Sequence, residues 1–196
     1  MLDMQNFLIK EQVGLLKVTD VYDIFNPETG AQVGQAKEVV SGLNKLMRLF
    51  VSKKLMPAMF ECREHPEGAL VFYLKKPVGL FRSIVEVYDA NGKKLGYFKS
   101  KLLSLGGGFW VYDNKDQQFA EIKGKWTGWE FKFLSSEGHE LGNVTKKWAG
   151  ALKELFTSAD NYIVSISPDL AEQPIAKILL LAAALAIDAV YYEQGE

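Results

Sequence analysis

Only two histidines and one cysteine are available for acid–base, nucleophilic or metal chemistry in this chain of 196 residues. Neither His65 nor His139 has the spacing of a metal-ligand pair with Cys62 or with the other histidine. If Cys62 lies on a strand, Arg63 and His65 share the opposite face, so the thiol has no neighbouring base. We therefore predict a protein without a catalytic constellation, without a zinc site and without a cofactor.

The basic residues offer a different chemistry, which is the binding of anionic lipid. Apolar residues recur at helical spacing over 43–50, which predicts a short amphipathic helix. Basic residues beside exposed apolar ones are typical of a membrane-surface contact. The candidate lipid-binding residues on and after this helix are Lys45, Arg48, Lys53 and Lys54. Five further basic pairs are interpreted as solvated strand faces: Lys75–Lys76, Lys93–Lys94, Lys99 with Lys101, Lys123 with Lys125, and Lys146–Lys147.

The composition indicates an ordinary soluble globular protein. Apolar residues make up 48% of the chain, and 23 basic residues against 24 acidic ones give a formal net charge of −1. A near-neutral balance argues against a nucleic-acid partner. A single cysteine and an N-terminus without a signal-peptide pattern favour the cytoplasm. We expect one domain over residues 1–196 and a monomer.

Alternation of polar and apolar residues is the dominant pattern, as in residues 129–133, and it predicts strands. Several turn sequences are followed by a returning strand, so the chain reads as a series of β-hairpins. In each, a turn residue suited to positive φ precedes a small residue by four positions. These pairs are Gly30 and Gly34, Gly92 and Gly96, Asp116 and Ala120, and Gly138 and Gly142. An all-β domain follows, either a sandwich or a barrel.

The stretch 175–192 breaks this pattern, because residues 178–187 are apolar on every side of a helix. Such a helix must be surrounded by lipid or by protein. The apolar run covers ten residues, whereas a membrane span needs about 20. Lys177 and Asp188 flank the run, and each would cost roughly 3 kcal/mol near a bilayer centre. We therefore predict a helix that fills the inside of a barrel, with Pro174 in its first turn.

The chain resembles the phospholipid scramblase family and its relatives, the LURP-one-related and tubby-like proteins. The segments that carry the resemblance are 138–142, 146–150, 156–162 and 185–193, with 7–12 and 22–26 matching the opening strands. The resemblance implies a twelve-stranded β-barrel that encloses the C-terminal helix. It also implies that the chain binds or acts on membrane phospholipids and lies at the membrane as a peripheral protein.

The same resemblance implies a calcium segment, of which Asp160, Asn161 and Asp169 remain as metal-ligand candidates. Ser158 stands where the family has an aspartate, and calcium prefers six to eight oxygen ligands. The alternative interpretation is a turn capped by Asp160 and Asn161. We expect no response to micromolar calcium.

Two functions stay open at this point. The first is a non-catalytic, scramblase-related module whose partner is an anionic phospholipid membrane. The second is a soluble interaction or regulatory module with the same fold, an unknown protein partner and no lipid transport. Animal scramblases carry a lipidated, cysteine-rich extension, and its absence here favours the second function.

Overall fold

The structure of the chain is a computed structural model. It describes residues 1–12, 19–40, 56–65, 67–77, 84–101, 108–125, 129–146 and 161–191. The predicted amphipathic helix at 43–50 lies outside these residues.

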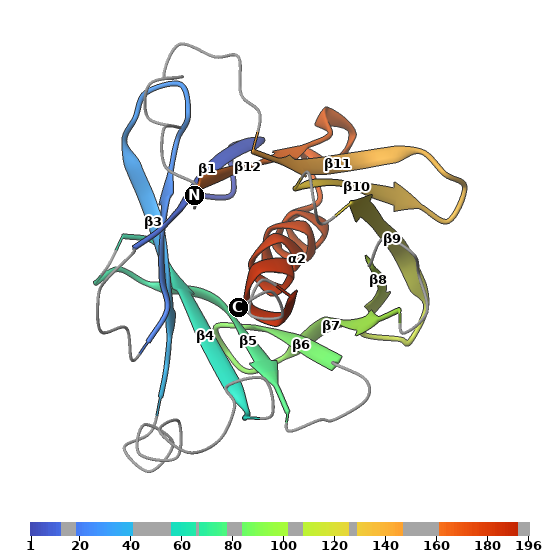
Figure 1. The fold of residues 1–196 in the computed structure, drawn as a ribbon, viewed down its shortest axis with the longest axis horizontal. Helices are drawn as coiled ribbons and strands as arrows, with labels where there is room; N and C mark the ends of the chain where they lie inside the picture. The colour runs from blue at the N-terminus through green and yellow to red at the C-terminus, as the bar shows by residue number, and fades with distance from the viewer. Residues whose placement is uncertain are drawn as a thin grey trace.

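Twelve antiparallel strands form one closed barrel, which confirms the predicted fold class (Figure 1). Each strand pairs with its neighbour in the sequence, and β1 closes the ring by pairing with β12. The strands are β1 (Asn6–Glu11), β2 (Val21–Phe25), β3 (Gln32–Glu38), β4 (Ala58–Arg63), β5 (Leu70–Lys76), β6 (Ile84–Asp89), β7 (Lys94–Ser100), β8 (Gly108–Asp113), β9 (Gln118–Lys125), β10 (Glu130–Ser135), β11 (Glu140–Thr145) and β12 (Asn161–Ile166).

Alternation along each strand divides the barrel into an apolar inside and a polar outside. On β10, Phe131 and Phe133 are buried in the core, whereas Glu130 and Lys132 are exposed. Successive side chains of a strand point to opposite faces, so a period of two in the sequence becomes two faces of the barrel wall. The core therefore lies inside the ring of strands.

The inside is filled by helix α2 (Pro174–Tyr191), which follows β12 and a short 3-10 turn, η4 (Pro168–Leu170). From Leu179 to Ile187 no residue is more than 2% exposed. Figure 1 shows the helix surrounded by strands, as predicted. Four alanines in this stretch keep the helix narrow enough for the side chains of the wall to pack against it.

Lys177 is the exception to this apolar environment. Its side chain is only 3% exposed, and Nζ donates a hydrogen bond of 2.8 Å to the backbone carbonyl of Leu2. A buried ammonium group needs such an acceptor, because an unpaired one loses its hydration without compensation.

Short turns join five strand pairs: β2–β3, β4–β5, β6–β7, β8–β9 and β10–β11. Because neighbouring strands run in opposite directions, all five turns lie at one end of the barrel. We call this the hairpin end. The four predicted turn residues all have positive φ: 73° at Gly30, 83° at Gly92, 60° at Asp116 and 86° at Gly138. The returning strand of each hairpin carries a register shift close to the turn.

The small residue four positions later is required by a close backbone approach. At Gly96, a Cβ atom would lie 2.3 Å from the carbonyl oxygen of Tyr112 on β8, so any side chain would push the two strands apart.

The turns are further stabilised by side-chain caps. Asp89 Oδ1 accepts the backbone N–H groups of Asn91 and Lys93, each at 2.9 Å. Asp113 and Ser135 cap their own turns in the same way.

Candidate functional site: a lysine-rich end of the barrel

Lysines gather at the end of the barrel opposite the hairpins. Odd-numbered strands run toward this end, and lysines lie near or just after the ends of four of them. We define the lysine end by six residues near or just after the ends of β5, β7, β9 and β11: Lys75, Lys76, Lys99, Lys101, Lys123 and Lys146. Because every second strand of an antiparallel barrel ends at the same mouth, lysines far apart in sequence meet on one surface.

At the ends of β7 and β9, two lysines share one carboxylate. Lys101 forms an ion pair with Glu121, and its Nζ lies 3.9 Å from the ring centroid of Trp110 on β8. Lys123 reaches the other oxygen of Glu121 at 3.1 Å and remains 59% exposed. Burial alone would raise the pKa of Glu121, but hydrogen bonds from both lysines outweigh it and keep the pKa below its usual value. The two lysines together carry more charge than the single carboxylate neutralises.

Two further lysines of this end lie over aromatic rings. Lys75 Nζ is 5.2 Å from the ring centroids of both Tyr73 and Tyr88, and Lys146 Nζ is 4.5 Å from that of Trp129. The ring faces attract the ammonium groups without neutralising them. Tryptophan, tyrosine and lysine together are typical of surfaces that meet the interfacial region of a bilayer.

The aromatic rings continue along the outside of β5 to β8. Tyr73 and Tyr88 are cross-strand partners whose rings stack with centroids 5.0 Å apart, and Tyr97 and Tyr112 repeat the arrangement at 4.8 Å. Direct opposition in the register brings the rings together. Between the two pairs, Glu86 accepts hydrogen bonds from Lys94 and from the Tyr88 hydroxyl, and the Lys94 bond is the main cause of its lowered pKa.

The hairpin end has the opposite charge. The five turns at 26–31, 64–69, 89–93, 113–117 and 135–139 contain seven acidic residues and two lysines. The acidic ones are Glu28, Glu64, Glu67, Asp89, Asp113, Asp116 and Glu137, and the lysines are Lys93 and Lys115. The two ends therefore differ in their balance of charge, since the lysine end also holds Glu11, Glu86 and Glu130 at or near the ends of their strands.

Most candidate residues from the sequence are not tested by this geometry. Lys45, Arg48, Lys53 and Lys54 lie outside the described residues, between the last residue of β3 and the first of β4 in the sequence. They stay predictions.

Of the calcium candidates, Asp160 also lies outside the described residues. Asn161 is the first residue of β12, while Asp169 lies beyond the other end of that strand. Six extended residues span roughly 17 Å, so these two side chains do not reach one cation. The Asp169 carboxylate instead accepts the Ser167 hydroxyl, and Ser167 Oγ accepts the backbone N–H of Asp169. Within the described part of the chain, no three His, Cys, Asp or Glu side chains gather as metal ligands.

Cys62 lies on the face of β4 opposite Arg63, as predicted from the alternation of a strand. Its side chain faces the core, only 1% exposed, and burial raises the pKa of the thiol far above its usual value. His65 and His139 are exposed in hairpin turns.

The lysine end was visible in the sequence only as separate pairs. Three complete pairs and Lys146 of a fourth fall at one mouth, and only Lys93–Lys94 lies at the hairpin end. Counting the strands would have revealed this surface, because lysines near the ends of every second antiparallel strand lie at the same end of the barrel.

No helix within the described residues is both long and apolar enough to cross a membrane. A scan against family models matches residues 22–194 to the model described as Scramblase. Comparisons with curated proteins and with solved structures find no match.

Proposed function

The chain belongs to the scramblase family, and from this premise we propose that it is a non-catalytic barrel module that binds anionic phospholipid membranes through its lysine end. The supporting observation is the group of six lysines around one mouth of the barrel, opposite a mouth whose turns hold more acidic residues than lysines.

This arrangement favours one orientation at a negative surface. A basic side chain near an anionic bilayer contributes about 1 kcal/mol, so several lysines on one surface are sufficient for measurable binding. The acidic turns are repelled at the same time, which turns the opposite end toward the solvent. Ion pairing with Glu121 lowers the contribution of Lys101 and Lys123, so Lys75 and Lys99 carry more of the attraction.

The aromatic side chains fit the same role. Trp110 and Tyr88 lie beside the lysines on the barrel wall, half-buried. Rings with a polar edge are suited to the headgroup region, where one side is wet and the other apolar. Binding of this kind is peripheral and needs no spanning segment.

The test is co-sedimentation with vesicles of phosphatidylcholine alone or mixed with phosphatidylserine. We expect binding only to the mixed vesicles, decreasing as salt shortens the range of the attraction to about 8 Å near physiological ionic strength. The double variant Lys75→Glu, Lys99→Glu should lose most of this binding. A separate variant reversing Lys45, Arg48, Lys53 and Lys54 measures what the predicted helix adds.

The matched control is Lys93→Glu with Lys115→Glu, which makes the same change of charge at the hairpin end. It should bind like the unmodified chain, with an unchanged melting temperature in both double variants. Equal loss in the two variants would show an effect of net charge rather than of the lysine end. An unmodified chain that ignores anionic vesicles even at low salt would leave the soluble protein-interaction module as the better description.

A further inference from the structure

A cavity of about 490 Å³ lies on the outside of β3 and β4. Its size is within the range of small-molecule sites. Its walls are Thr19, Gln35, Lys37, Glu38, Val39, Val40, Glu61 and Arg63.

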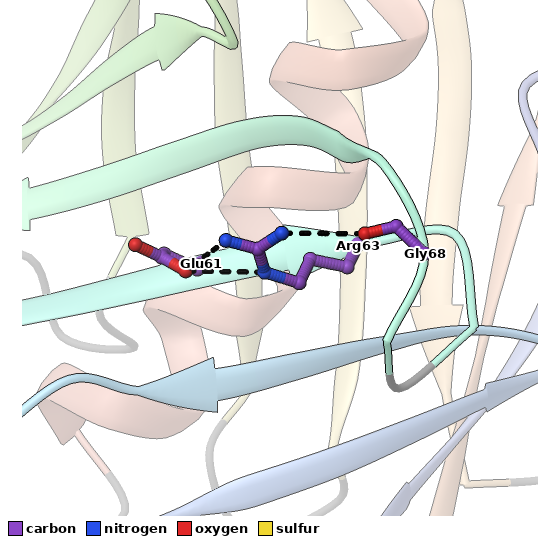
Figure 2. Close-up of polar contacts among 3 residues, drawn as sticks. All are labelled: Glu61, Arg63 and Gly68. Atoms are coloured by element: carbon purple, nitrogen blue, oxygen red, sulfur yellow. Dashed lines mark hydrogen bonds and ion pairs between the residues drawn. The ribbon is translucent and has the colours of Figure 1, made fainter.

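Arg63 is held in place on this wall by its neighbours (Figure 2). Its Nε and Nη2 donate to Glu61 Oε2 at 3.2 and 2.8 Å, and its Nη1 donates to the carbonyl oxygen of Gly68 at 3.2 Å. Glu61 comes from the same strand and Gly68 from the β4–β5 turn, so the guanidinium is anchored on two sides. A fixed arginine loses little conformational freedom when it binds a ligand.

The guanidinium still has hydrogen bonds to offer. Three of its five N–H donors are used within the described structure, which leaves one on Nη1 and one on Nη2. These two terminal nitrogens are the pair with which arginine binds both oxygens of a carboxylate.

A second cation lines the same cavity. Lys37 on β3 is opposite Glu61 in the register, yet it forms no ion pair with any described residue, because Glu61 is turned to Arg63. Glu38 is 2% exposed and accepts the backbone N–H of Asp20 at 3.4 Å. The lining holds two cations and two carboxylates; Glu61 is paired with Arg63 and Glu38 is buried, so Lys37 is the exposed charge of the lining without an ion pair to a described residue.

The cavity also has an apolar wall. Val39 is 47% exposed and is one of two large hydrophobic side chains that the described residues leave open to solvent. An apolar side chain beside a fixed arginine and an unengaged lysine suits a ligand with an anionic head and a short hydrocarbon chain.

We propose that this cavity binds a small carboxylate ligand, with the carboxylate between Arg63 and Lys37 and its apolar chain against Val39. The site lies toward the same mouth of the barrel as the lysine end, on β3 and β4, but it shares none of the six residues that define that end and does not depend on membrane binding.

The experiment is isothermal titration of the full chain with hexanoate, in the absence of lipid. Hexanol serves as the uncharged analogue and hexylamine as the cationic one. We expect saturable binding of hexanoate alone. Lys37→Gln, at an exposed position without ion pairs, should weaken it about tenfold, and Arg63→Gln should remove it.

Lys115→Gln is the matched control, since it removes an exposed lysine at the hairpin end, and it should leave the affinity unchanged. The proposal is overturned if hexanoate does not bind, if hexanol or hexylamine binds as well, or if Lys37→Gln has the affinity of the control. The Lys37 variant keeps the test valid even where Arg63→Gln loosens the β4–β5 turn. Vesicle binding of the same variants, measured in parallel, tests the proposed function independently of hexanoate binding.

Discussion

The two ends of the barrel carry opposite charges for different reasons. At the hairpin end, two of the seven acidic residues stabilise the turns: Asp89 and Asp113 each accept two backbone N–H groups of their own turn. At the lysine end, Lys75 and Lys99 cap no turn and form no ion pair with a described carboxylate, although Lys75 lies opposite Glu86 and its charge helps to lower the pKa of that carboxyl. A charged residue that stabilises a turn is weak evidence for a binding surface. A charged residue that stabilises no local structure is stronger evidence.

We expect the interior of the barrel, rather than either end, to provide most of the unfolding free energy. Leu181→Asp tests this, because a charge at a fully buried position of α2 has no partner. We expect a loss of at least several kcal/mol in unfolding free energy, enough to unfold a domain of ordinary stability. Denaturant titration followed by circular dichroism measures it. Leu181→Met keeps the volume and should cost less than about 1.5 kcal/mol; an equal effect of both variants would contradict the packed interior.

The contrast between structural acids and unengaged lysines predicts unequal effects on stability. Asp89→Ala removes a side chain that caps two N–H groups, and it should cost roughly 1 kcal/mol. Lys99→Ala should change unfolding free energy by less than about 0.5 kcal/mol. Thermal melts of the two variants beside the unmodified chain are sufficient. Similar losses of unfolding free energy at both positions would contradict this difference between the two ends.

A smaller effect is expected from the carboxylate within the lysine end. The pKa of Glu121 is lowered in the folded chain, so its stabilising effect is present above the unfolded pKa and is lost as pH falls through the folded value. Glu121→Gln should therefore cost about 1 kcal/mol at pH 7 and much less near pH 3. Denaturant titrations at the two pH values compare this variant with the parent. A cost independent of pH would assign the effect to packing instead.

Calcium should have the smallest effect of all. Asn161 and Asp169 lie at opposite ends of β12, and Asp169 is engaged by Ser167. We expect no shift in melting temperature with micromolar calcium, although a site saturated a hundredfold would add about 2.7 kcal/mol. A clear upward shift that disappears in Asp160→Ala would establish the site.

Local patterns in the sequence were sufficient to predict the strands, the turns and the buried helix. The φ values at Gly92 and Asp116 and the buried stretch 179–187 follow from residue type and periodicity, which act over a few residues. The resemblance supplied the number of strands.

The candidate sites depend instead on relations between distant segments. Lys75 and Lys146 share a mouth only because the barrel closes with alternating strand direction. The cavity at Arg63 is lined from two strands, β3 and β4, and its guanidinium is held by the carbonyl of Gly68 in the next turn. Neither the composition of one segment nor the spacing of its residues reveals which distant segments lie beside it.

The position of β12 and α2 in the chain has a consequence for synthesis. β12 is the strand that joins β1 to β11, and α2, which fills the ring, follows it directly. A nascent chain that has delivered the first eleven strands therefore has two unpaired sheet edges and an apolar lining with no filling. Exposed edges and apolar surfaces of this kind are where incomplete chains associate with one another. The barrel can close only after β12 and α2 have left the ribosome, so until then the first eleven strands need protection by chaperones that cover exposed apolar surface.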